Sequence, residues 1–233
     1  IMGVLIALII MLLWLGHLAY ILLNVTVAWD NPWMYLHIVL QAYLYTGLFI
    51  TGHDAMHRKV SKNKFVNNAI GYAAVFMFAG MSFRLLKKNH WDHHRYPGTE
   101  QDPDFSTRSQ NFWAWWFKFM VHYTTIWQLI TMAVFYNVLY RLAEIALPSL
   151  IVFWIVPAFL ATFQLFYFGT YLPHRTPHTE EMGKHKARTL KRNHLWAMAS
   201  CYFFGYHYEH HASPGTPWWQ LYRIKDKGTP EHG

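Results

Sequence analysis

Residues 33–57, WMYLHIVLQAYLYTGLFITGHDAMH, place a long apolar run directly before two histidines that are four positions apart. A helix needs about 20 mostly apolar residues to cross a bilayer. Imidazoles at positions i and i+4 project from the same face of a helix. The stretch therefore predicts a transmembrane helix over 33–52 that carries His53 and His57 where it leaves the membrane.

The composition of the whole chain favours a polytopic membrane protein. Of 233 residues, 54% are hydrophobic, 19% are aromatic and only 14% are charged, which leaves little charge for a water-soluble surface. The chain has 16 histidines and a single cysteine, Cys201. One cysteine excludes a disulfide framework and a cysteine-rich metal site. Any bound metal is therefore expected to be held by imidazole.

We predict an all-α integral membrane fold, a single membrane-embedded domain over 1–233 with about four spans and additional interfacial or re-entrant helices. The apolar runs 69–83 and 195–206 are too short to cross comfortably, and the Trp-rich segment 111–122 suits the headgroup level. Ile1 starts the chain abruptly without a methionine, which predicts that a native N-terminal tail precedes it. The predicted spans are 1–23, 33–52, 124–140 and 145–172.

The positive charge gathers in the same connecting segments as the histidines. The formal net charge is +8, and lysine and arginine cluster in 58–64, 84–95 and 184–192, whereas 24–32 has one acid and no basic residue. The positive-inside rule then places the histidine-rich segments in the cytoplasm. Topology accounts for the charge, so a nucleic-acid partner is not expected, whereas the lipid bilayer is.

Eight histidines fall into three sets with helical ligand spacing. A single pair of this kind is usually a surface or capping pair, but three sets on one side of a membrane predict metal binding. Eight imidazoles exceed what one ion accepts, so the simplest solution is a cytoplasmic cap with two metals. The sets are His53 and His57 in "HDAMH", His90, His93 and His94 in "HWDHH", and His207, His210 and His211 in "HYEHH".

Imidazole suits iron, zinc, copper and nickel alike, so the spacing does not choose the metal. A structural zinc site is satisfied by four ligands and needs no membrane helices beside it. Two redox-active irons beside a lipid-facing pocket instead suit O2 activation against a C–H bond, because O2 and apolar substrates both partition into bilayers. The chain has no Gly-rich dinucleotide motif, so we expect no flavin or NAD(P)H site. Electrons would then come from a partner, and the basic face suits an acidic ferredoxin.

The three boxes resemble the histidine boxes of integral-membrane di-iron oxygenases and desaturases. The longer strings "HWDHHRYPGTEQDPDF", "FGTYLPHR" and "FGYHYEHHASPGTPWWQL" are similar to bacterial-type β-carotene ketolases, and the similarity covers about 52–221. This resemblance implies a di-iron enzyme in a bacterial inner membrane or another energy-transducing membrane. It also implies a further ligand between the second and third boxes, which by position is His174.

The resemblance further implies oxygen-dependent conversion of ring carbon C4 of β-ionone rings to a ketone, through successive hydroxylation and loss of water. The substrates would be β-carotene, echinenone and zeaxanthin, and the products canthaxanthin and astaxanthin. A fatty-acid desaturase, a lipid hydroxylase or a carotenoid 3-hydroxylase of the same superfamily is an alternative. A membrane metal-binding or transport protein is less consistent with ligands at span ends. A haem subunit would need His17 and His37, which we expect to hydrogen-bond between helices.

Further residues are predicted around the metals. Carboxylates beside ligands can accept the second N–H of an imidazole and fix its tautomer. Aromatic side chains near the boxes could wall a channel for a long polyene. We expect His178 to belong to a polar loop and His194 to a helix entrance rather than to the ligand set. The predicted carboxylates are Asp54, Asp92, Asp102, Asp104 and Glu209, and the predicted channel residues are Trp91, Phe105, Trp113, Phe203 and Trp218.

Overall fold

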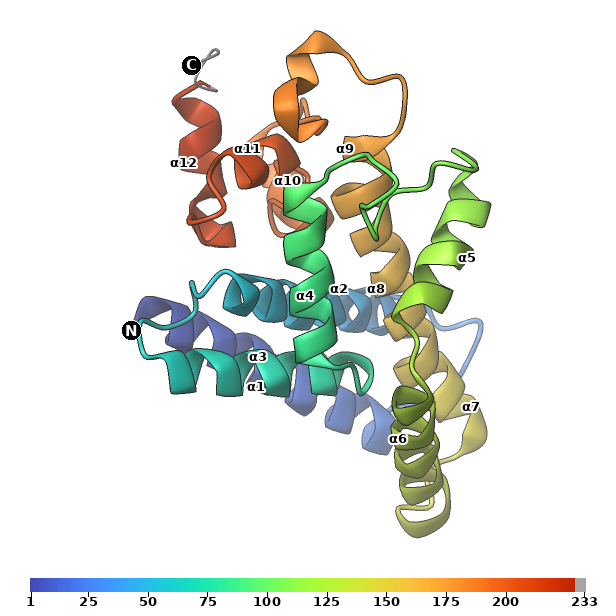
Figure 1. The fold of residues 1–233 in the computed structure, drawn as a ribbon. Coiled ribbons are helices and arrows are strands. Elements are labelled where there is room, and N and C mark those ends of the chain that lie inside the picture. The colour runs from blue at the N-terminus through green and yellow to red at the C-terminus, as the bar shows by residue number, and fades with distance from the viewer. Residues whose placement is uncertain (229–233) are drawn as a thin grey trace.

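The computed structural model describes residues 1–228, and all regular elements in this part of the chain are helices. The all-α prediction is therefore confirmed. In Figure 1 the C-terminal elements α10 to α12 gather at one end of the molecule, close to the C-terminal end of α4. The helices are α1 (Met2–Asn24), α2 (Pro32–Met56), α3 (Lys64–Ala79), α4 (Phe83–Arg95), α5 (Phe112–Tyr123), α6 (Ile126–Asn137), η1 (Val138–Leu142), α7 (Leu147–Ser149), η2 (Leu150–Ile155), α8 (Val156–Phe166), η3 (Tyr167–Tyr171), α9 (Leu172–His174), η4 (Glu180–His185), α10 (His194–Cys201), α11 (His207–Ala212), η5 (Trp218–Gln220) and α12 (Leu221–Asp226).

Three helices within residues 1–228 are long and apolar enough to cross a membrane. They are α1, α2 and the continuous helix Leu147–His174, which comprises α7 to α9 with the segments between them. These helices correspond to the predicted spans 1–23, 33–52 and 145–172. The predicted span 124–140 forms α6 and η1, a helix that ends at Leu142 and is not among the three. It is slightly shorter than the roughly 20 residues that a crossing needs.

Helices α3 and α4 meet at a sharp corner. Their axes differ by 100°, so the pair is either one broken span or a re-entrant loop, which is the kind of element predicted for 69–83. Gly80 adopts a left-handed conformation with φ 64° and ends α3, and the Ser82 side chain then accepts the backbone N–H of Leu85 at the start of α4. Glycine takes a positive φ without steric cost. The corner turns α4 toward the C-terminal elements (Figure 1).

The helix Leu147–His174 contains wide π-helical turns before two of its prolines. The π segments are 150–155, directly before Val156 and Pro157, and 167–171, directly before Leu172 and Pro173. A proline inside a helix lacks the N–H donor and crowds the carbonyl one turn earlier, and a π turn accommodates both defects without ending the helix. The helix therefore continues past both prolines and ends at His174.

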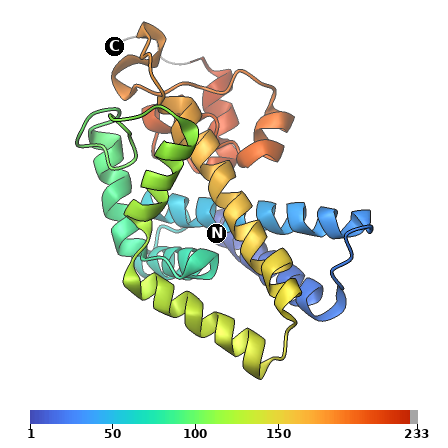
Figure 2. The ribbon, with the colours of Figure 1, turned by 90° about the vertical axis from the view of Figure 1, so that its right-hand side faces the viewer.

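Helix α2 lies between α1, α3 and α8, and it packs against all three. Figure 2 shows the helix that contains α8 crossing α2, while α6 lies at the edge of the bundle. Helix α1 buries Ile10 and Trp14 but exposes Leu12 and Leu13, so its apolar character extends all round, as expected for a helix in lipid. His17 Nε2 lies 3.1 Å from His37 Nδ1 and thus joins α1 to α2, as predicted.

Candidate metal centre

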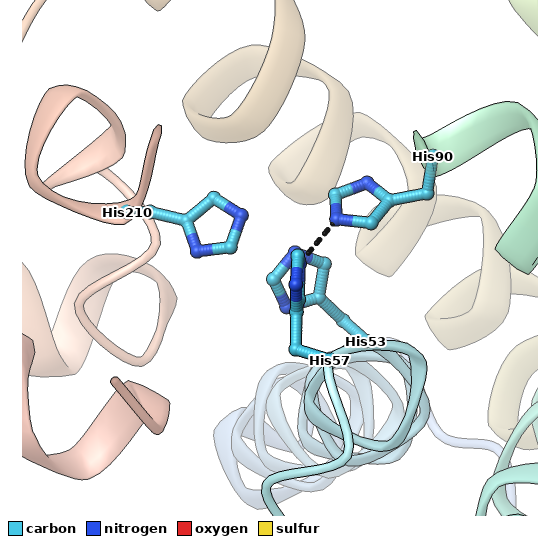
Figure 3. Close-up of side chains that lie close together, drawn as sticks. All are labelled: His53, His57, His90 and His210. Carbon is cyan, nitrogen blue, oxygen red and sulfur yellow. Dashed lines mark hydrogen bonds between the residues drawn. The ribbon is translucent and has the colours of Figure 1, made fainter. Parts of the chain in front are cut away.

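A first group of four histidines forms where α2 ends. His53 and His57 come from the last turns of α2, His90 from α4 and His210 from α11, and one ring nitrogen of each lies within 4.8 Å of the others. The His57 Nε2 atom is 2.6 Å from His90 Nε2. Figure 3 shows the four rings gathered around a common space. We call these four residues the first group.

A second group of four histidines lies directly beside the first. It consists of His93 from α4, His174 from the end of the long helix, and His207 and His211 from α11, again with ligand atoms within 4.8 Å of one another. His211 Nε2 is 3.1 Å from both His93 Nε2 and His207 Nε2. All four side chains are buried. Helices α4 and α11 each contribute to both groups.

His94 lies between the two groups. Its Nε2 atom is 2.9 Å from His210 Nε2 and 3.1 Å from His90 Nε2, both in the first group. Its ring stacks on His211 of the second group with 4.2 Å between ring centroids. The structure thus gathers all nine histidines predicted as ligands, and it places His94 where it could complete the first group.

Hydrogen bonds to two histidines of the second group fix which ring nitrogen faces inward. His93 Nδ1 lies 2.9 Å from Asp102 Oδ1, and His174 Nδ1 lies 2.9 Å from the backbone oxygen of Lys186. Each Nδ1–H donates to its acceptor, so Nε2 keeps a free lone pair directed into the second group. This is the tautomer that a metal requires.

Several ring nitrogens of the two histidine groups have no hydrogen-bond partner. These buried atoms include Nε2 of His174, both ring nitrogens of His53, and Nδ1 of His57 and His207. A buried polar atom without a partner costs about 1–3 kcal/mol. Burial also lowers the pKa of His57 to about 3 and the pKa of His210 well below its ordinary value, so these imidazoles are neutral. Neutral imidazoles whose Nε2 atoms converge, such as those of His57 and His210, fit divalent metal ions.

Of the five predicted carboxylates, three lie near histidines of the two groups and two pair with lysines. Asp102 contacts His93 directly, and its two oxygens also accept the backbone N–H groups of Gly98 and Asp104 at 2.8 and 2.9 Å. Asp104 Oδ2 is 3.9 Å from His93 Nδ1, and Asp54 Oδ1 is 3.8 Å from His53 Nδ1.

The other two carboxylates pair with lysines. Asp92 Oδ2 lies 3.1 Å from Lys88 Nζ, and the buried Glu209 has Oε1 3.4 Å from Lys225 Nζ. On a helix, residues two positions apart do not face each other. Asp92 and Glu209 each lie two positions after a histidine of the same helix, His90 and His207, and therefore turn away from it.

A cavity of about 100 Å³ adjoins both groups. Its walls include His53 and His90 of the first group and His93 and His207 of the second. From there it continues between apolar side chains, with a few polar groups among them. The other lining residues are Phe49, Met56, Phe78, Ala79, Met81, Leu86, Asp104, Phe119, Met120, Tyr123, Thr124, Gln128, Thr162, Leu165, Gly169, Thr170 and Phe204.

The five aromatic residues predicted for a channel lie elsewhere. Trp91 is 43% exposed, and Trp113 is 63% exposed in a separate open groove between α2 and α8. Phe105 packs against Trp115. The two remaining residues, Phe203 and Trp218, pack on neighbouring aromatic rings of the C-terminal segment, because the connection around them folds back on itself.

The sequence contained a signal for part of the actual cavity wall. Phe49 lies four residues before His53, and Leu86 lies four residues before His90. Side chains at i and i+4 share one helix face, so both point to the side of their helix that carries the ligand. Phe78 and Phe204 have no such local signal, because tertiary packing brings them to the cavity.

The two further histidines that the sequence raised belong to neither group. His178 Nε2 lies 3.0 Å from the backbone oxygen of His174, and the His178 ring packs on Phe105. His194 at the start of α10 binds the Tyr206 hydroxyl at 2.8 Å and Asp226 Oδ1 at 2.9 Å. Both have local partners, as expected for a loop and a helix entrance.

Comparison with known proteins gives a family match over most of the chain. The model of the family described as fatty acid desaturase matches residues 30–135 and 122–231. No solved structure matches significantly.

The curated relatives of this chain include ketolases. The chain is 39% identical to a zeaxanthin 4-ketolase of Chlamydomonas reinhardtii, over 77% of this chain and 41% of the relative. It is 36% identical to β-carotene 4-ketolase 3 of Haematococcus lacustris, over 79% of this chain and 59% of the relative. It is 37% identical to a β-carotene ketolase of Paracoccus sp. (strain N81106 / MBIC 01143), over 80% of this chain and 76% of the relative. The chain thus spans about half the length of the two algal relatives. The predicted resemblance is confirmed.

Proposed function

The chain belongs to the fatty acid desaturase family, and we propose that within this family it is an oxygen-dependent carotenoid 4-ketolase. The observation that carries the proposal is the shared cavity. Histidines of both groups open into one largely apolar space that continues between membrane helices. An apolar ring that enters from the bilayer would meet both groups at once. The ketolase relatives favour a carotenoid ring as this substrate.

The proposed reaction converts the C4 methylene of a β-ionone ring to a ketone. Each hydroxylation consumes one O2, two electrons and two protons, and it yields one hydroxyl group and one water. A second hydroxylation at the same carbon gives a geminal diol, which loses water. The substrates would be β-carotene, echinenone and zeaxanthin, and the products canthaxanthin and astaxanthin.

Two iron ions would be the cofactors, and when bound they would supply the activation of O2. The first group, with His94 completing it, would hold one iron, and the second group would hold the other. Four or five imidazoles suit a divalent iron that keeps an open position. We propose no flavin or NAD(P)H site on this chain.

The protein's own residues would orient the ligands and shape the space. Asp102 and the Lys186 backbone oxygen hold the His93 and His174 tautomers. The ring of Phe204 packs on His53 with 5.0 Å between centroids, so it forms part of the wall nearest the first group. Phe49, Phe78 and Phe119 continue this wall. An apolar wall of this kind would exclude bulk water and present the ring edge to the histidines.

The placement in the cell follows from charge and from the electron demand. We propose that the histidine-rich face is cytoplasmic, in a bacterial inner membrane or another energy-transducing membrane, because the basic residues lie in the same segments. The electrons would come from a ferredoxin. A metal transporter is disfavoured, because the ligands lie at the ends of α2 and of the helix Leu147–His174 rather than at mid-span.

Pigment analysis tests the proposed function. The full chain is expressed in a host that accumulates β-carotene, beside His57→Ala, His210→Ala and the control His194→Ala, which removes a histidine outside both groups. We expect ketocarotenoids from the wild type and from His194→Ala, and none from the other two variants. Product without a ketone, such as a 3-hydroxylated carotenoid or a desaturated lipid, would support the alternative enzymes and contradict the ketolase proposal.

A further inference from the structure

An exposed side chain of α4, Trp91, contacts the candidate metal centre. The Trp91 indole is 43% exposed, yet its ring centroid lies 5.1 Å from that of His57 and 5.9 Å from that of His94. A tryptophan that is open to solvent on one side and packed on two ligand histidines on the other connects the surface to the centre.

Basic side chains surround this tryptophan. Lys87 lies four residues before Trp91, Lys88 three residues before it, and Arg95 four residues after it. Residues at these spacings share one helix face. The Lys88 side chain is 74% exposed, and Arg95 is exposed as well.

The acid on the outer side of α4 is Asp92, which pairs with Lys88 at 3.1 Å. Three basic side chains against one acid leave this face with a net positive charge.

We propose that this surface, the Trp91 face, is the docking site for a small acidic protein that carries one electron. Its residues are Lys87, Lys88, Trp91 and Arg95. The inference rests on the proposed function in one respect, namely that the reaction consumes electrons. Each oxygen insertion needs two, so two reduced carriers would each be oxidised by one electron while O2 is reduced to the new hydroxyl and one water.

The chemistry of the face fits such a carrier. Complementary charge raises the rate of encounter between two proteins and orients them. Tryptophan is enriched among the residues that carry most of the binding energy in interfaces. A carrier that docks on Trp91 would bring its redox centre close to the first group.

A second surface near the centre provides a matched control. The His185 ring lies 5.8 Å from that of His211, and Tyr208 packs on it. The charges there are mixed, because Glu181 pairs with Lys191 at 3.7 Å. Lysines at this surface can be reversed in charge without touching the Trp91 face.

The test measures binding rather than catalysis. The purified full chain is placed in nanodiscs of zwitterionic lipid, and an acidic [2Fe–2S] ferredoxin is the probe in biolayer interferometry. We compare the wild type with two test variants and one control. The test variants are the double variant Lys87→Glu with Arg95→Glu and the single variant Trp91→Ala, and the control is Lys184→Glu with Lys191→Glu. Gel-filtration profile and thermal midpoint check that each variant is folded.

We expect the double variant to bind about 10-fold more weakly at low salt and with a flatter salt dependence, and Trp91→Ala to lose about 10-fold as well. The control should remain within about twofold. Equal losses in the control, or unchanged binding in both test variants, would overturn the proposal. Binding of the same variants to anionic lipid vesicles is measured in parallel. If the two test variants keep their ferredoxin binding but lose binding to these vesicles, the face recognises lipid headgroups, and the proposal is overturned.

This result is independent of the pigment assay. The probe binds a protein that need not convert any carotenoid, so a wild type that makes no ketone contradicts the proposed function but leaves the binding data unchanged. Conversely, an active ketolase whose Trp91 face does not bind ferredoxin contradicts only the docking site.

Discussion

Substitution of Asp102 by asparagine should weaken the second group selectively. Asp102 is 3% exposed, and its oxygens accept three N–H groups, from the His93 ring at 2.9 Å and from the backbone of Gly98 and Asp104 at 2.8 and 2.9 Å. His93 and Asp104 share Oδ1, whereas Gly98 uses Oδ2. Asparagine has the same shape but only one accepting oxygen, so it cannot serve both sides.

Either orientation of the new amide has a cost. If its oxygen faces His93, its NH2 group meets the Gly98 N–H, donor against donor. If the amide is reversed, the NH2 group faces His93 Nδ1 and drives the ring proton to Nε2, which blocks metal binding. Loss of a buried hydrogen bond to a charged group is worth about 1.5–3 kcal/mol. Loss of such a partner of a metal ligand typically lowers metal affinity by about 10–100-fold.

The assay is anaerobic titration of the metal-free protein with Fe²⁺, for the wild type, Asp102→Asn and the control Asp92→Asn. We expect Asp102→Asn to show one site of near wild-type affinity and one site weakened by about 10–100-fold. Asp92 pairs with Lys88 on the outer side of α4, so Asp92→Asn should titrate like the wild type. Two sites of unchanged affinity in Asp102→Asn would refute the role assigned to this carboxylate.

Three further predictions follow from the buried histidines, one close contact and the cavity. Burial lowers the pKa of His57 to about 3 and the pKa values of His210 and His211 well below 6.5. Below pH 6.5 the unfolded chain therefore binds more protons than the folded chain, so the metal-free protein should lose stability as the pH falls from about 6.5 toward 3. The loss is up to about 1.4 kcal/mol per histidine and pH unit. Thermal midpoints in detergent check this, and a midpoint that rises on acidification would contradict it. In Gly169→Ala the new Cβ would lie 2.0 Å from Phe204 Cε1. We therefore expect the free energy of unfolding to fall by about 1–3 kcal/mol, which a lower thermal midpoint would show. An unchanged midpoint would mean that the Phe204 ring moves away without cost. Ala79 lines the cavity from the end of α3 and is not a histidine-group residue. In Ala79→Trp the indole should block the cavity, so pigment analysis should show no ketone while metal analysis shows unchanged iron. Full ketone formation would remove this cavity from the substrate path.

The sequence predicted the histidine sets well because their geometry is local. Within one helix, spacing alone decides which side chains share a face, so His53 with His57 and His207 with His211 could be paired from the chain itself. The two-metal prediction required only that the three sets meet. The division between the groups was not predictable, since His90 and His93 are three residues apart on α4 and yet belong to different groups. Only the packing of α2, α9 and α11 around α4 decides this.

The cavity and the membrane spans show the same limit. Hydrophobic length identified three of the four predicted spans, whereas the fourth, 124–140, forms α6 and η1, which are not among the helices long and apolar enough to cross a membrane. The channel prediction relied on aromatic residues close to the boxes along the chain, such as Trp91, and proximity along the chain does not show on which side of α4 a ring lies. Asp102 was recognised as a candidate because a short turn follows the second box, whereas Asp92 lies on the outer face of the helix.

The iron content of the purified chain tests the central claim most directly. Metal-free protein is loaded anaerobically with Fe²⁺, freed of excess metal and analysed for iron per chain, beside His57→Ala from the first group and His174→Ala from the second. Loading with iron matters, because zinc outranks ferrous iron for such ligands and would enter during purification. We predict about two irons in the wild type and about one in each variant. A wild type that binds a single iron, or variants that each retain two, would contradict a centre built from two adjoining histidine groups.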